Sequence, residues 1–119
     1  MDATRSAIEK AEGFLTLGMG LDAWETLEDL PAESKNDQRV LELKLACLCN
    51  QSSWEKAIIL DESITAALPR SALALFWLGV AHCQLGDVQE ARKVLGRAVD
   101  LDPCIRERLI KEPLLEAIW

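Results

Sequence analysis

Apolar residues recur along the chain at intervals of three and four, the spacing that places them on one face of a helix. Strict alternation of apolar and polar residues over the length of a strand occurs nowhere. The pattern therefore predicts an all-α fold. The expected helices cover residues 3–17, 21–30, 37–50, 54–68, 72–85, 88–101 and 103–110, and Pro113 starts a short final helix.

Polar residues and glycines at the ends of these segments predict how each helix starts and stops. A short polar side chain before a helix can accept a hydrogen bond from a free N–H of the first turn, and a glycine after a helix can adopt the left-handed backbone conformation. The expected N-caps are Asp37 or Asn36, Ser52 or Ser53, Ser71 and Asp87, and the expected helix ends are Gly18, Gly20 and Gly86. Short turns between the helices indicate antiparallel pairs.

A comparison of spacings indicates an internal repeat. Equivalent residues in the second and third helix pairs are separated by one constant interval, which is the same for Ala57 and Ala91 as for Pro69 and Pro103. In the first pair, the stretch at Trp24 aligns with the stretch at Trp54 at a shorter interval. The first unit is therefore expected to have lost about one helical turn after Leu30.

Residues 72–105 carry a recognisable set of large, small and turn residues: Leu75, Leu78, Gly79, His82, Gly86, Asp87, Ala91, Leu95, Ala98 and Pro103. This pattern resembles the tetratricopeptide repeat (TPR), a helix–turn–helix unit of about 34 residues. The resemblance implies an α-solenoid of antiparallel helix pairs forming a single domain over residues 1–119. Its repeats would cover about residues 4–36 (atypical), 38–71 and 72–105, with a C-terminal cap at about 106–119.

The resemblance also implies where a partner binds, because TPR arrays hold a peptide or partner segment in a concave groove lined by the first helix of each pair. The inward positions, transferred by the repeat frame, are Glu9, Glu12, Thr16, Arg39, Glu42, Cys49, Asn50, Leu73, Phe76, Val80 and Gln84. Acids at one end and apolar residues at the other favour a basic–apolar partner segment. The alternative is that the acids are only solvated and that Leu73 and Phe76 pack under the terminal helix.

The terminal sequence PLLEAIW permits two interpretations. Leu114, Leu115, Ile118 and Trp119 are expected to fold back over the third repeat. Otherwise they form an exposed apolar patch that supports a homodimer or inserts into a groove.

Composition and charge narrow the class of partner. Half of the residues are apolar, the formal net charge is −7, and no basic cluster exceeds the Arg92–Lys93 pair. Nucleic acid is an unsuitable partner, because neutralising phosphates needs a basic face. No apolar run reaches the length of a membrane span, and the polar amino terminus has no signal core, so a cytoplasmic location without membrane insertion is expected.

The candidate reactive groups do not form a catalytic or metal site. His82 and Cys83 are neighbours on one helix, so their side chains diverge, and Cys47 and Cys49 have no matching second pair for zinc. The four cysteines are expected to be free, mostly buried thiols, and no cofactor is expected. The expected function is a non-catalytic adaptor or scaffold that binds protein. The alternatives are a dedicated chaperone for a secreted or assembly-prone partner and a self-associating structural module.

Overall fold

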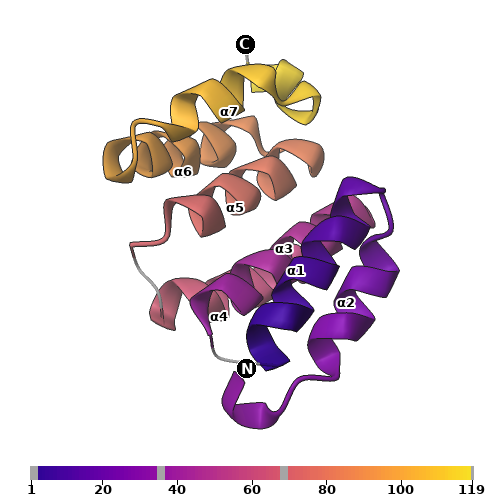
Figure 1. Ribbon diagram of the computed structural model, residues 1–119. Coiled ribbons are helices and arrows are strands. Elements are labelled where there is room, and N and C mark those ends of the chain that lie inside the picture. Colours follow the sequence, from indigo (N-terminus) through magenta and orange to yellow (C-terminus); the bar gives the residue numbers. More distant parts are fainter. Residues whose placement is uncertain (1–2, 35–36, 68–69, 119) are drawn as a thin grey trace. The chain divides into compact units, whose positions relative to one another are not determined.

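The structure, a computed structural model, describes residues 3–34, 37–67 and 70–118, and all regular structure within these residues is helical (Figure 1). The predicted all-α fold is confirmed. Asn36, Leu68, Pro69 and Trp119, which entered the predictions, lie outside the described residues. The chain divides into two compact units, Met1–Ser53 and Trp54–Trp119, and each is described by itself. The extent of the single domain and of its three repeats stays a prediction.

The first unit contains α1 (Ala3–Thr16), α2 (Gly20–Glu28), the 3-10 helix η1 (Ala32–Ser34) and α3 (Gln38–Asn50). Helix α1 packs against α2 and α3, and α2 packs against α3. Small and branched residues fill the space between the three helices. The buried core consists of Ala11, Ala23, Leu27, Leu30, Val40, Leu43 and Cys47.

The second unit contains α4 (Trp54–Ala67), α5 (Ala72–Gln84), α6 (Val88–Leu101), α7 (Ile105–Lys111) and the 3-10 helix η2 (Pro113–Ile118). Helices α5 and α6 form the central hairpin, and α4 packs against α5 (Figure 1). Both α7 and η2 contact α5 and α6. The core of this unit includes Leu75, Phe76, Val80, Cys83, Ala91, Val94, Leu95, Ala98, Ile105, Leu109 and Leu115.

Three of the predicted N-caps are confirmed. The side chain of Asp37 accepts a hydrogen bond from the backbone N–H of Arg39, and the side chain of Ser71 accepts one from that of Ala74. Asp87 caps α6 in the same way through the N–H of Glu90. Each cap satisfies a donor that has no partner within its helix, which fixes where the helix begins.

The turn residues correct the predicted frame of the first repeat. Gly18, Ser52 and Gly86 all adopt positive φ, at 73°, 57° and 88°, and successive members of this set are one full repeat apart. Ala23, Ala57 and Ala91 have the same spacing, and all three are buried. The expected shorter interval in the first unit is therefore wrong, as is the expected helix end at Gly20, which begins α2. Helix α2 is short, but η1 and the residues around it restore the length of the unit.

Ser52 should destabilise the middle turn, because a side chain is unfavourable in the left-handed region that glycine occupies at the two equivalent positions. We expect Ser52→Gly to raise the free energy of unfolding by about 1 kcal/mol. Chemical denaturation followed by circular dichroism measures the change. The matched variant Gly86→Ser should lower stability by a similar amount, and equal stability of both variants with the parent chain would contradict the argument.

Candidate partner-binding surface

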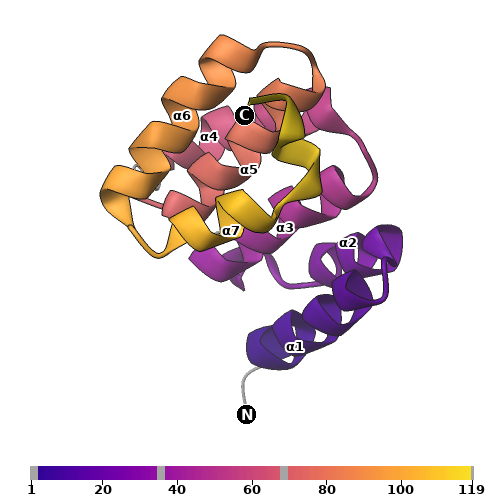
Figure 2. The same ribbon diagram turned by 90° about the horizontal axis from the view of Figure 1, so that it is seen from above.

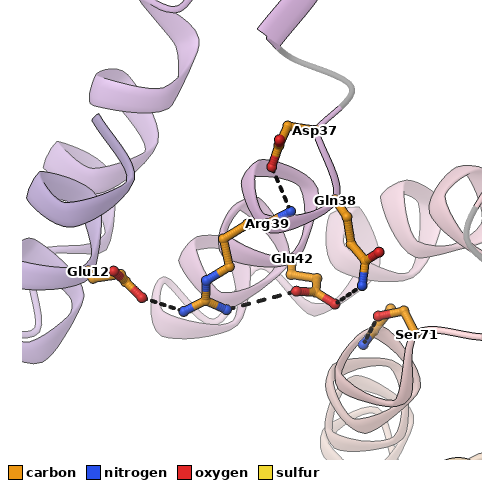
Figure 3. Close-up of polar contacts among 7 residues, drawn as sticks. Glu12, Asp37, Gln38, Arg39, Glu42 and Ser71 are labelled. Atoms are coloured by element: carbon orange, nitrogen blue, oxygen red, sulfur yellow. Dashed lines mark hydrogen bonds and ion pairs between the residues drawn. The ribbon is translucent and has the colours of Figure 1, made fainter. Parts of the chain in front are cut away.

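In the first unit, three of the predicted groove residues form one charged network on α1 and α3 (Figure 3). The guanidinium of Arg39 lies 2.5 Å from a carboxylate oxygen of Glu12 and 3.9 Å from one of Glu42. Gln38 donates a further hydrogen bond to Glu42 at 3.2 Å. Arg39 is therefore already placed between the two acids that were expected to attract a basic partner.

This network changes the electrostatics of the predicted groove. Glu42 is 8% exposed, whereas the side chains of Glu12 and Arg39 keep 43% and 41% of their surface. One cation offsets one of the two carboxylates, so the attraction for a basic segment is weaker than the sequence suggests. Glu9 stands apart on the exposed side of α1, where its contact is an i,i+4 ion pair with Arg5 at 3.5 Å. Glu9 and the exposed edge of Glu12 are the acids that a partner can reach.

Three other predicted groove residues of this unit have structural roles. Asn50 accepts a hydrogen bond from the backbone N–H of Gly20 at 3.0 Å and so satisfies the N-terminus of α2, whose preceding residue provides no side-chain cap. The hydroxyl of Thr16 donates to the carbonyl of Glu12 within α1. Cys49 is 4% exposed. Thr16 and Asn50 nevertheless stay exposed, so a partner can reach them as well as Glu9, Glu12 and Arg39.

In the second unit, the predicted apolar anchor is covered by the chain itself. Phe76 and Val80 are fully buried, and Leu73 packs half-buried against the same core. The ring of Phe76 meets Trp77 edge-on at 5.0 Å, and the guanidinium of Arg108 on α7 lies 4.9 Å from its centre. The prediction of an open apolar anchor is wrong here, because α7 and η2 pack on this face. Leu73 and Phe76 instead pack under the terminal segment, which is the alternative that the sequence left open.

The segment that covers this face runs alongside α5 (Figure 2, yellow). Leu115 is completely buried, whereas its neighbour Leu114 is 38% exposed. The side-chain amide of Gln84 donates a hydrogen bond of 2.6 Å to the backbone carbonyl of Leu114, and the thiol of Cys83 approaches the same oxygen at 3.5 Å. The terminal residues up to Leu115 therefore fold back as expected, and the side chain of Ile118 lies outside the described residues.

Comparison with known proteins identifies a repeat in the second unit. Residues 72–103, which span the whole of α5, the turn and α6, match the tetratricopeptide repeat family. These residues form one tetratricopeptide repeat. "Cellulose synthase 2 operon protein C" of Komagataeibacter xylinus is a relative, 37% identical over 70 residues that make up 59% of this chain. The matched stretch is 5% of that relative, so the likeness extends to a short piece of a much longer protein.

The TPR frame did not identify two side chains that complete these surfaces. Arg108 lies beyond the matched repeat, and its position above the rings of Phe76 and Trp77 comes from the path of α7. Lys44 is 8% exposed and reaches Glu28 at 2.8 Å, with the ring of Trp24 at 5.1 Å. A cation on a different helix from its aromatic partner leaves no local sequence signal. The one signal in the sequence is that Lys44 lies among apolar residues of α3. A lysine in such a position is buried and therefore needs a partner such as Glu28.

The four thiols are free, as expected, and three of them are buried, while Cys104 is exposed. Among the described residues, no group of three or more His, Cys, Asp or Glu side chains could hold a metal ion. His82 lies half-buried on α5 at the position that TPR units fill with an aromatic ring. Within the described ranges, no helix has the length and apolar character needed to cross a membrane.

Burial raises the pKa of the Cys47 thiol to about 11. Because the native state holds this proton more tightly than the unfolded chain, the resulting stability is fully present below about pH 9 and is lost as the pH rises toward 11. We expect the free energy of unfolding to fall over that interval. Cys47→Ala removes this titration, so its stability should fall less steeply when both chains are denatured at each pH. Parallel pH profiles would contradict the assignment.

Proposed function

We propose that this chain, which contains a tetratricopeptide repeat, is a non-catalytic adaptor or scaffold that binds partner protein on two surfaces, α1 and α3 in the first unit and α5 in the second. TPR proteins are in general protein-interaction modules, which supports a protein partner. The observation that carries the proposal is the contact between α5 and the chain's own residues 113–118. In that contact, a helix at a predicted groove position recognises a peptide backbone through Gln84 and a leucine side chain through its apolar face.

The proposed partner is basic where it meets the first unit and apolar where it meets the second. Glu9 and the exposed edge of Glu12 favour positive charge near α1, because Arg39 offsets only part of the local negative charge. The face of α5 favours an apolar side chain next to a free backbone carbonyl. Exposed charges at the rim of a surface act mainly on association rate and salt dependence, so the apolar contact would provide most of the affinity.

A peptide-display selection against the intact chain tests this function. Enriched peptides should share a basic–apolar pattern, and hydrogen exchange should show protection on α1, α3 or α5 when they bind. Glu9→Lys should weaken the binding, since Glu9 is exposed and its ion pair contributes little to stability. Glu55→Lys on α4 is a matched control, because Glu55 is exposed on the second helix of a pair and its replacement makes the same change in charge. Absence of enrichment, or protection confined to α2 and α6, would reject the proposal.

Self-association is a second candidate, supported by two exposed apolar residues of the terminal region. Ile110 keeps 64% of its surface and Leu114 keeps 38%. These residues could form the centre of a contact between two copies. Size-exclusion chromatography with light scattering measures the mass, and a monomer at high protein concentration would exclude this candidate. The name of the bacterial relative adds no partner, since the likeness covers a small part of it.

A further inference from the structure

The C-terminal segment makes the contacts that a bound peptide would make. Its backbone carbonyl at Leu114 accepts the amide hydrogen of Gln84, and Leu115 is buried in the core of the second unit. Leu114 points toward solvent enough to remain 38% exposed. A short peptide lying on a helix face makes contacts of this kind. It buries one side chain, has one backbone carbonyl bound by the helix, and leaves a neighbouring side chain in solvent.

This segment is separable from the helix before it. Helix α7 ends at Lys111, Glu112 has extended backbone at φ −84° and ψ 111°, and Pro113 has no N–H with which to continue the helix. The following residues form a 3-10 helix, which is weakly stable by itself. The order of residues 113–118 therefore comes largely from their contacts with α5 and α6.

Polar recognition at this point favours a peptide site over a purely apolar cap. A cap needs apolar coverage, which Leu115 provides, whereas the bond from Gln84 recognises a main-chain group that is the same in any peptide. Gln84 is exposed and occupies an inward position of the TPR frame. A partner segment with the same chemistry can therefore make the same contacts.

We propose that residues 112–118 are a displaceable intramolecular occupant of the α5 face, and that the face takes a partner segment in which a leucine stands two positions after a proline. This inference rests on the proposed function and identifies the apolar part of the partner. Tethering gives the segment a high effective concentration, so it competes with any partner that is free in solution. Binding of a partner and release of the terminal segment are then coupled.

The test uses the full chain and a fluorescein-labelled peptide with the sequence of residues 111–119, and measures fluorescence anisotropy. Leu115→Asp should release the segment, because a carboxylate cannot be buried at a fully covered apolar position. We expect this variant to bind the peptide about ten-fold more tightly than the parent chain, or better. Leu114→Asp is the matched control, and it should bind as weakly as the parent because Leu114 is already exposed.

Adding Gln84→Ala to Leu115→Asp should weaken peptide binding by about five-fold, the effect of losing one hydrogen bond. Far-ultraviolet circular dichroism checks that each variant keeps its helices, and Leu115→Ala provides a milder release. Equal peptide binding by the parent and both Leu115 variants would overturn the inference, as would loss of helical structure in both, which would mark the segment as an essential cap. Selected peptides that protect α1 or α3 would support the proposed function in either case, so failure of this inference is distinct from failure of the proposed function.

Discussion

Replacing Phe76 by alanine is expected to lower the free energy of unfolding by about 3–5 kcal/mol. The side chain is completely buried in the core of the second unit, where it packs edge-on against Trp77 and lies under the guanidinium of Arg108. Removing it would leave a cavity between α5 and α7 and would also remove the ring that Arg108 contacts. Urea denaturation followed by circular dichroism measures the loss.

Leu73→Ala provides the comparison for this prediction, because Leu73 lies on the same helix but is only partly buried. Its truncation should cost less, about 1–2 kcal/mol. A cost for Phe76→Ala as small as that of Leu73→Ala would mean that the ring is accessible. Phe76 would then be available to bind an apolar side chain of a partner, as the repeat frame predicts.

The helices and their caps could be predicted from sequence because they depend on local chemistry. Asp37, Ser71 and Asp87 each need only a nearby N–H in the first turn of the helix, and all three form the expected caps. The repeat at residues 72–105 could also be predicted, since the spacing of its small and large residues is itself the signature of a tetratricopeptide repeat. The helix caps and the repeat spacing do not depend on how the rest of the chain packs.

The shorter interval expected for the first unit is wrong because Trp24 is a poor marker of the repeat frame. A large aromatic residue can move by a turn along a helix and still find apolar contacts, whereas a small residue at a close helix crossing cannot. Ala23, Ala57 and Ala91 are the constrained positions, and with the turn residues they keep the full repeat spacing. The same frame places Asp61 at the position of Leu27 and Leu95, where it is fully buried. Nothing in its local sequence indicates burial of an acid.

The candidate surface was harder to predict because its contacts join residues far apart in sequence. The ion pair between Glu12 and Arg39 spans 27 positions, and the bond from Gln84 to the Leu114 carbonyl spans 30. The repeat frame assigns positions to a groove, but it does not indicate which of them the chain itself occupies. On α5 the terminal segment occupies the groove positions of Phe76 and Val80, which it covers.

Gly79→Ala should lower the free energy of unfolding by about 2 kcal/mol, although alanine is the better helix former. A Cβ atom at this position would overlap Cγ of Leu95 and would lie 2.5 Å from one of its methyl carbons. Leu95 is itself 2% exposed, so its branched side chain has little space into which to move. Helices α5 and α6 must therefore separate or repack, and Gly79→Val should cost more than Gly79→Ala.

Gly96→Ala separates this steric effect from helix propensity. Gly96 lies inside α6, and a Cβ atom there would meet nothing within 4 Å. Its replacement should raise stability by about 0.5–1 kcal/mol, because alanine restricts the unfolded chain and favours the helix. Denaturation midpoints of the two alanine variants should therefore move in opposite directions from that of the parent chain. If both moved upward, the crossing of α5 and α6 would not depend on the missing side chain at Gly79, and the close approach to Leu95 would not constrain this position of the repeat.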